Sequence, residues 1–131
     1  MIRLVSLALA IFSCSAVSVA TAGDFDGSKK LICAPVLAMD CSAGAGCTKG
    51  LPNEIGAPAF MRVDFAKKEV IGPQRTSEIH SIEKSTEQIV LRGAELGFAW
   101  TMAVGQLDGG MSLSLVDSNG VFVLFGSCAP L

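Results

Sequence analysis

The fold class is clearest in residues 98–125, which have the sequence FAWTMAVGQLDGGMSLSLVDSNGVFVLF. Phe98, Trp100 and Met102 occupy alternate positions, with small or polar residues between them. Successive side chains of a strand point to opposite faces, so this pattern predicts a half-buried antiparallel strand. Residues 111–115 alternate in the same way, with serines between the apolar side chains. The segment is therefore typical of an all-β domain.

Two turns divide this segment into three strands. The first turn lies at residues 108–110, and the second at residues 117–120 contains Asn119-Gly120. Asn-Gly between two apolar runs predicts a tight hairpin, because both residues tolerate positive φ. Residues 121–125 are apolar at every position, which predicts a strand buried on both faces.

Shorter strands are predicted upstream of this segment. Met61, Val63 and Phe65 share one face of a strand, and a turn at residues 66–68 leads into another strand at residues 69–71. The next strand that alternates clearly contains Ile89 and Leu91.

Residues 77–84, between these strands, allow two interpretations. Ile79 and Ile82 fall on opposite faces of a strand unless a β-bulge lies between them. A helix is the alternative. The structure of this segment stays open from the sequence alone.

These strands define the predicted architecture. Together with one strand near Cys33 they form an antiparallel meander of about 7–8 short strands, closed as a small barrel or folded as a sandwich. We expect a single β domain at residues 23–131, with the meander at residues 59–128. Residues 23–58 contain Cys, Gly and Pro, which predicts an irregular, disulfide-stapled loop segment.

The first residues are typical of a secretory signal peptide. Arg3 precedes an apolar run at residues 4–12, and Ala20-Thr21-Ala22 matches a cleavage site. The apolar run is too short to cross a bilayer. We therefore predict that residues 1–22 are a signal peptide, which places the domain in the periplasm or outside the cell.

Cleavage after Ala22 leaves 131 − 22 = 109 residues with 9 basic and 12 acidic side chains, a net charge of 9 − 12 = −3. Basic and aromatic residues are not clustered, so nucleic acid is not an expected partner. We expect a monomer without a membrane span.

Cys14 offers an alternative start for the mature chain. Residues 11–14, Ile-Phe-Ser-Cys, loosely resemble a lipobox, in which the cysteine is acylated and cleavage occurs before it. Phe12 is bulkier than the residues usual at that position of the motif. In this alternative a lipid anchor would tether the domain to a membrane surface.

Four cysteines remain after the predicted cleavage, and an even number in a small exported domain suggests two disulfides. Three connectivities are possible. We favour Cys41–Cys47, which closes a short loop of small residues, and Cys33–Cys128, which ties the first strand to the last. Zinc is not expected, because the chain has no C-x-x-C pair and a single histidine.

That histidine, His80, is the main candidate for catalysis. Ser77 or Ser81 could be its nucleophile, with a nearby glutamate orienting the imidazole. Neither a G-x-S-x-G elbow nor an oxyanion motif accompanies them. A hydrolase that uses His80 is therefore the least favoured function, and we predict neither an enzyme nor a cofactor.

Five segments resemble a group of small exported proteobacterial proteins of unknown function. The resemblance covers nearly the whole mature chain and implies neither an activity nor a ligand. By analogy, the architecture is also similar to the small barrels of lipocalin-like and lysozyme-inhibitor families. The five segments are residues 31–35 (LICAP), 60–65 (FMRVDF), 100–102 (WTM), 110–112 (GMS) and 120–130 (GVFVLFGSCAP).

The aromatic residues suggest a possible binding face, formed by Phe98, Trp100, Met102 and Phe65. These side chains would either fill the core or line a cavity for a small apolar ligand. The leading hypothesis is an exported, non-enzymatic binding module of the cell envelope. A protein-interaction or inhibitor module that uses residues 41–58 is the alternative.

Overall fold

A computed structural model describes residues 23–131 of the protein. The predicted signal peptide and the alternative lipid anchor at Cys14 lie outside the described residues. The described chain folds into nine strands and one short 3-10 helix. Its elements are β1 (Leu31–Ser42), β2 (Gly46–Gly50), η1 (Pro52–Ile55), β3 (Met61–Asp64), β4 (Glu69–Ile71), β5 (Thr76–Lys84), β6 (Gln88–Glu95), β7 (Phe98–Gly105), β8 (Gly110–Val116) and β9 (Gly120–Pro130).

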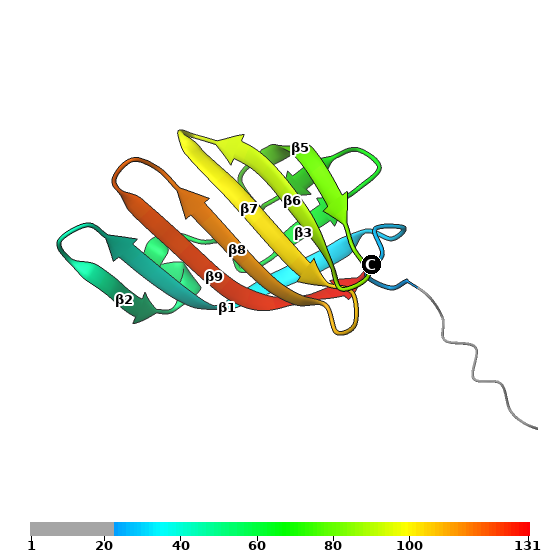
Figure 1. The fold of residues 1–131 in the computed structure, drawn as a ribbon, viewed down its shortest axis with the longest axis horizontal. Coiled ribbons are helices and arrows are strands. Elements are labelled where there is room, and N and C mark those ends of the chain that lie inside the picture. Colours follow the sequence, from blue (N-terminus) through cyan, green and yellow to red (C-terminus); the bar gives the residue numbers. More distant parts are fainter. Residues whose placement is uncertain (1–22) are drawn as a thin grey trace, which may run out of the picture.

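The strands form a closed antiparallel barrel. Each strand from β3 to β8 pairs with the next one along the chain, and β1 pairs with both β3 and β9 (Figure 1). The predicted meander is confirmed. Between the two architectures left open by the sequence, the structure has the barrel, built from eight strands with β2 added at the edge of β1.

β1 is the longest strand and changes its partner along its length. Its start pairs with β3, whereas residues 38–42 pair with β2, and β9 follows β1 from end to end. The β1–β2 hairpin therefore extends beyond the barrel, at the left of Figure 1. Among the described residues, no helix is long and apolar enough to cross a membrane.

The prediction of an irregular segment at residues 23–58 is wrong where this hairpin lies. Pro35 favoured the irregular prediction, because proline usually interrupts a strand. Here the ladder shifts register between Pro35 and Leu37, so a β-bulge absorbs the irregularity. The glycines of this segment also favoured that prediction. In the structure Gly44 and Gly46 have φ of 81° and 72° and form the tight turn of the hairpin.

The barrel interior holds one apolar face of each strand. β9 shows the consequence of closure: Phe122 and Leu124 face the interior, whereas Phe125 points outward and is 39% exposed. The prediction that residues 121–125 are buried on both faces is therefore wrong, because a barrel strand has only one interior face. The largest fully buried side chains are Leu31, Val63, Ile79, Ile89, Leu91, Met102, Val104 and Leu124.

A β-bulge at His80 settles the structure of residues 77–84. The register of β5 with β6 shifts between Ile79 and Ser81, so that Ile79 and Ile82 both pack against the core. The strand interpretation with a bulge is confirmed, and the helix alternative is wrong.

The predicted hairpin at residues 117–120 is present, but without the expected positive φ at Asn119 and Gly120. The Asp117 carboxylate instead accepts hydrogen bonds from the backbone N–H groups of Asn119 at 2.8 Å and of Gly120 at 3.0 Å. These hydrogen bonds favour the ionised carboxylate and lower the pKa of Asp117.

Residues 23–30 pack against the barrel end at which β7 finishes. Phe25 lies over Gly109, where an added Cβ would be 2.5 Å from the phenyl ring. Lys30 Nζ lies 3.1 Å from the buried Asp64 carboxylate, which also accepts a hydrogen bond of 3.0 Å from the Lys67 backbone N–H. The Lys67 hydrogen bond, and then Lys30, lower the pKa of Asp64. The buried carboxylate is thus paired.

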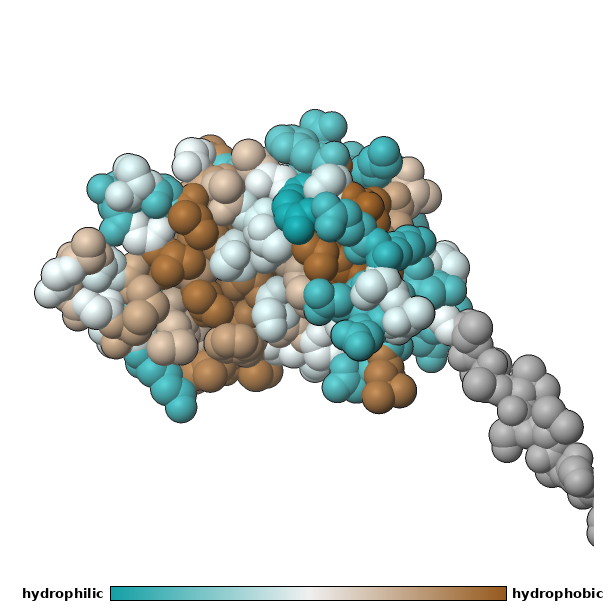
Figure 2. Space-filling model, in the orientation of Figure 1, coloured by the Kyte–Doolittle hydropathy of each residue, from teal (hydrophilic) through white to brown (hydrophobic). Residues whose placement is uncertain are grey.

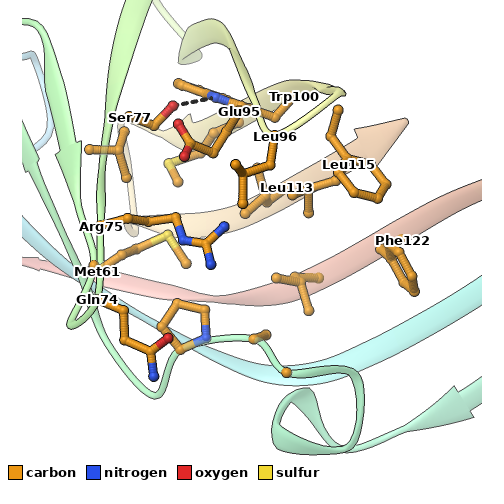
Figure 3. Close-up of a pocket in the computed structure, with 18 of the residues that line it drawn as sticks. Met61, Gln74, Arg75, Ser77, Glu95, Leu96, Trp100, Leu113, Leu115 and Phe122 are labelled. Carbon is orange, nitrogen blue, oxygen red and sulfur yellow. Dashed lines mark hydrogen bonds between the residues drawn. The ribbon is translucent and has the colours of Figure 1, made fainter. Parts of the chain in front are cut away.

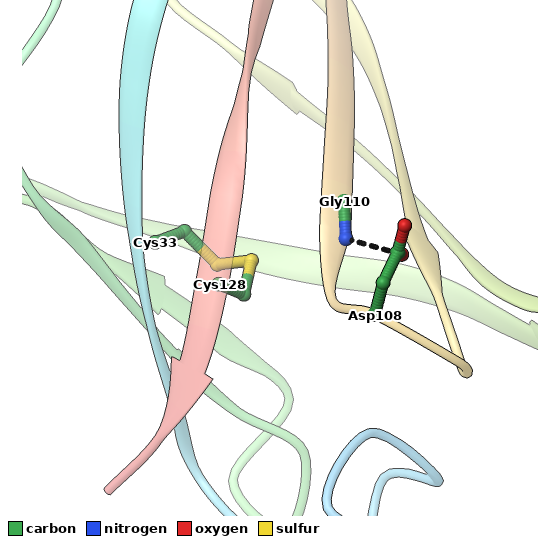
Figure 4. Close-up of a disulfide and its surroundings, with 4 residues drawn as sticks. All are labelled: Cys33, Asp108, Gly110 and Cys128. Atoms are coloured by element: carbon green, nitrogen blue, oxygen red, sulfur yellow. Dashed lines mark hydrogen bonds between the residues drawn. A yellow bond between two sulfur atoms is a disulfide. The ribbon is translucent and has the colours of Figure 1, made fainter.

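Both predicted disulfides are present. Cys33 and Cys128 are buried register partners in β1 and β9. Figure 4 shows the disulfide between them, near the turn at Asp108. Cys41 and Cys47 are register partners across the β1–β2 hairpin. The two bonds span sequence separations of 95 and 6 residues.

The difference in separation predicts unequal contributions to stability. A longer closed loop restricts the unfolded chain more, so replacing Cys33 and Cys128 together by Ala should lower the free energy of unfolding by about 4 kcal/mol. Replacing Cys41 and Cys47 should lower it by about 2 kcal/mol. Urea denaturation followed by circular dichroism measures both values. Equal losses would contradict this ranking.

Candidate functional site

The barrel is hollow at the end where β7 begins. A cavity of about 430 Å³ opens there, and Figure 3 shows it between the inner face of β7–β9 and the loops before β3 and β5. Residues 55–58, which follow η1, and residues 73–75 belong to these loops. The cavity therefore lies at the barrel end opposite residues 23–30.

The inner wall of the cavity is apolar. The alternation that buries one face of β7, β8 and β9 also supplies this wall, since each of these strands begins or ends at the open end. Phe98 and Phe122 come from β7 and β9, and their ring centroids are 5.9 Å apart. The other wall residues of these strands are Trp100, Met102, Leu113, Leu115 and Leu124.

Trp100 is held in place by contacts across two strands. Its indole lies directly over Gly93 in β6, where an added Cβ would clash with Cζ2 of the indole. The Nε1–H then donates a hydrogen bond of 2.9 Å to Ser77 Oγ in β5 (Figure 3). A buried indole N–H needs such an acceptor. Gly93 and Ser77 thus fix one side of the cavity, and their roles were not evident from the sequence.

The rim of the cavity is polar on one side. Gln74 and Arg75 lie in the loop before β5, and Glu95 ends β6. Figure 3 shows Arg75 and Glu95 on the same side of the cavity as Ser77. The cavity therefore combines an apolar interior with charged groups at its opening.

Leu96 stands out on this rim. It lies in the two-residue turn between β6 and β7, where Leu96 and Gly97 have φ of 48° and 85°. A left-handed conformation is unfavourable for leucine. The side chain is also 70% exposed, yet it lines the cavity. Leu96 therefore lowers stability both by its backbone conformation and by its exposed apolar side chain. Such strain is often found at functional positions.

Three of the four residues predicted for a binding face lie together. Phe98, Trp100 and Met102 line the cavity, whereas Phe65 lines a smaller pocket of about 310 Å³ near Lys30 and Lys84. β3 and β7 run in the same direction around the meander, so the residue after the end of β3 lies far from the start of β7. Met61, at the start of β3, takes the place expected for Phe65.

The residues considered for catalysis do not share a site. Ser77 faces the cavity and accepts the hydrogen bond from Trp100, whereas His80 is exposed at the bulge of β5. The described part of the chain also contains no cluster of three or more His, Cys, Asp or Glu side chains that could hold a metal ion.

The position of Leu96 predicts that a substitution can stabilise the protein. Asn adopts the left-handed conformation more readily than Leu, so Leu96→Asn should raise the free energy of unfolding by about 0.5–1 kcal/mol. Urea denaturation measures the change.

Leu107→Asn is the matched control, because Leu107 is 97% exposed in the next hairpin without a positive φ. If both substitutions changed stability equally, exposure of the leucine and not its backbone conformation would be responsible.

Comparison with known proteins adds no further likeness: no family, no curated protein and no solved structure matches this chain.

Proposed function

We propose that the protein is an exported binding module that takes up a small, largely apolar ligand in the open end of its barrel. The supporting observation is the cavity of about 430 Å³ lined by Trp100, Met102 and Leu113. Pockets for small molecules usually measure roughly 300–1,000 Å³ and combine apolar walls with a few polar groups. An eight-stranded barrel can hold one such ligand.

The filled part of the barrel limits the size of this ligand. Between the cavity and the barrel end that residues 23–30 cover, the interior is filled by fully buried side chains: Ile89, Leu91 and Val104. A ligand can therefore enter only the part of the barrel near the start of β7. There it would cover apolar side chains that otherwise face water. Removal of such surface from water favours binding by about 25 cal/mol per Å² before the costs of association.

The disulfides support the proposed location. Cys33–Cys128 and Cys41–Cys47 would form and persist in an oxidising compartment such as the periplasm or the extracellular space. Together with the predicted signal peptide, they favour a role in the cell envelope or outside the cell.

Fluorescence offers a direct test, because Trp100 is the only tryptophan and lines the cavity. The apolar dye N-phenyl-1-naphthylamine should bind, brighten and quench Trp100 by energy transfer. Leu115→Phe adds bulk inside the cavity and should weaken binding by about tenfold. Val116→Phe, at the next and outward-facing residue, should leave binding unchanged.

Loss of dye binding in both variants would point to a general disturbance of β8. Equal binding by the wild type and by both variants would place the dye elsewhere and remove the support for a ligand cavity.

A second candidate function uses the β1–β2 hairpin. It projects from the barrel and is stapled by Cys41–Cys47, and no other described strand pairs with β2 on its second edge. The outer face beside it carries Val116 and Phe125, which are 45% and 39% exposed, and Figure 2 shows apolar surface on this face. Large exposed apolar patches often mark protein interfaces. These features favour a module that binds or inhibits another protein.

Capture of partners from the periplasm of the source separates the two candidates. A protein bound through the hairpin should be lost when Cys41 and Cys47 are both replaced by Ala, because the unstapled hairpin must lose more conformational entropy on binding. The cavity variant Leu115→Phe should retain it. The opposite pattern, with capture lost only in Leu115→Phe, would exclude the hairpin as the binding element.

A further inference from the structure

We infer that the ligand of the cavity has a zwitterionic polar end, which the opposite charges of Arg75 and Glu95 bind together, and a single apolar chain. This inference rests on the proposed function and specifies its ligand. The zwitterionic end follows from three features of the opening: the two charges, their lack of protein partners and the tight turns that carry them. The single chain follows from the volume of the cavity.

The opening carries one side chain of each charge. Arg75 and Glu95 both line the cavity, and Figure 3 shows them on the side away from Leu115 and Phe122. The other titratable side chains described for this protein lie outside the cavity lining. Since the two charges cancel, the opening favours neither a simple cation nor a simple anion. A ligand that carries both charges can satisfy both groups.

These charges have not been neutralised by the protein. The ion pairs among the described residues involve neither Arg75 nor Glu95, although both face the same opening. Other charges of the molecule are paired: the buried Asp64 has Lys30, and Arg92 has Glu83. The opening is thus a place where a guanidinium and a carboxylate remain available for a ligand.

Both groups stand on tight turns. The Gly72 N–H donates a hydrogen bond of 2.8 Å to the Arg75 carbonyl oxygen, which closes the loop before β5. Glu95 is the register partner of Phe98 across the two-residue turn at Leu96 and Gly97. A fixed backbone lowers the entropy lost when side chains bind a ligand. The backbone positions from which the two charged side chains extend are therefore fixed before a ligand binds.

The size of the cavity indicates one chain. Its volume of about 430 Å³ lies near the lower end of the range for small-molecule pockets. The apolar wall of β7–β9 continues inward from the charged rim to Met102 and Leu124. An extended apolar chain can follow this wall while its polar end stays at the opening.

A set of ligands with the same twelve-carbon chain tests the inference. The members are N-dodecyl-N,N-dimethylglycine, dodecanoate, dodecyltrimethylammonium and dodecanol, each below the concentration at which micelles form. Quenching or shift of the Trp100 fluorescence reports binding to the wild type and to the variants Arg75→Gln and Glu95→Gln. Arg62→Gln and Glu78→Gln are matched controls, because they remove the same charges from exposed residues outside the cavity lining.

The zwitterion should bind the wild type about fivefold more tightly than the three other compounds, a ratio typical of an exposed charge contact. Arg75→Gln should weaken zwitterion binding about fivefold and make the cation bind better than the anion. Glu95→Gln should also weaken it and produce the opposite preference. The two controls should match the wild type.

Other outcomes distinguish failure of the zwitterionic assignment from failure of the proposed ligand binding. If all four compounds bound equally to the wild type and to every variant, the cavity would still take apolar chains and only the zwitterionic assignment would fail. If none of them bound, and the apolar dye did not bind either, the proposed function itself would fail.

A two-chain lipid with the same kind of head group distinguishes the sources of such a ligand. Dihexanoylphosphatidylcholine, used as a monomer below the concentration at which it forms micelles, should not displace bound N-dodecyl-N,N-dimethylglycine, because the cavity accepts one chain. Displacement by this monomeric two-chain lipid would overturn the single-chain assignment.

Discussion

β1 and β9 pair along their whole length, from Leu31 opposite Pro130 to Ser42 opposite Gly120. This pairing turns a meander with two free edges into a closed barrel, and it encloses the apolar faces of all eight strands. It also places Cys33 beside Cys128, so that a covalent bond secures the contact most distant in sequence. The same pairing determines where the cavity lies. β1 stays with β9 but leaves β3 after Cys33, and the loop after η1 completes the wall there without filling the interior.

Much of this fold could be predicted because it depends on local patterns. Alternation in β7 and β8 identified the interior residues, and the even number of cysteines limited their pairing. For Ile79 and Ile82 the sequence allowed a helix or a strand with a β-bulge, and the bulged strand is the structure found. The β1–β2 hairpin could not be predicted, since Pro35 and the glycines of its turn suppress the usual signals of a strand. The outward position of Phe125 could not be predicted either, because only closure of the barrel determines which apolar face of β9 is internal.

The candidate site was predictable only in part, for reasons of geometry. Phe98, Trp100 and Met102 belong to one strand, so their common face followed from their spacing. Phe65 was misplaced because strand direction and pairing determine which end of the barrel a residue occupies, and the alternation of residues 61–65 shows only which face it shares. Gly93 and Ser77 act on Trp100 from neighbouring strands, a relation that requires the register of β5, β6 and β7. No local pattern carries that information.

The two ends of the barrel resolve the same physical problem in different ways. At one end, Phe25 packs over the turn between β7 and β8 and Lys30 pairs with the buried Asp64, so the buried charge there has a partner within the chain. At the other end an exposed leucine takes a left-handed conformation, apolar walls face an opening, and Arg75 and Glu95 lack partners. A chain selected for stability alone would have closed both ends in the first manner. Open apolar walls and unpaired charges occur together at this end, which is the arrangement that the binding site proposed here requires.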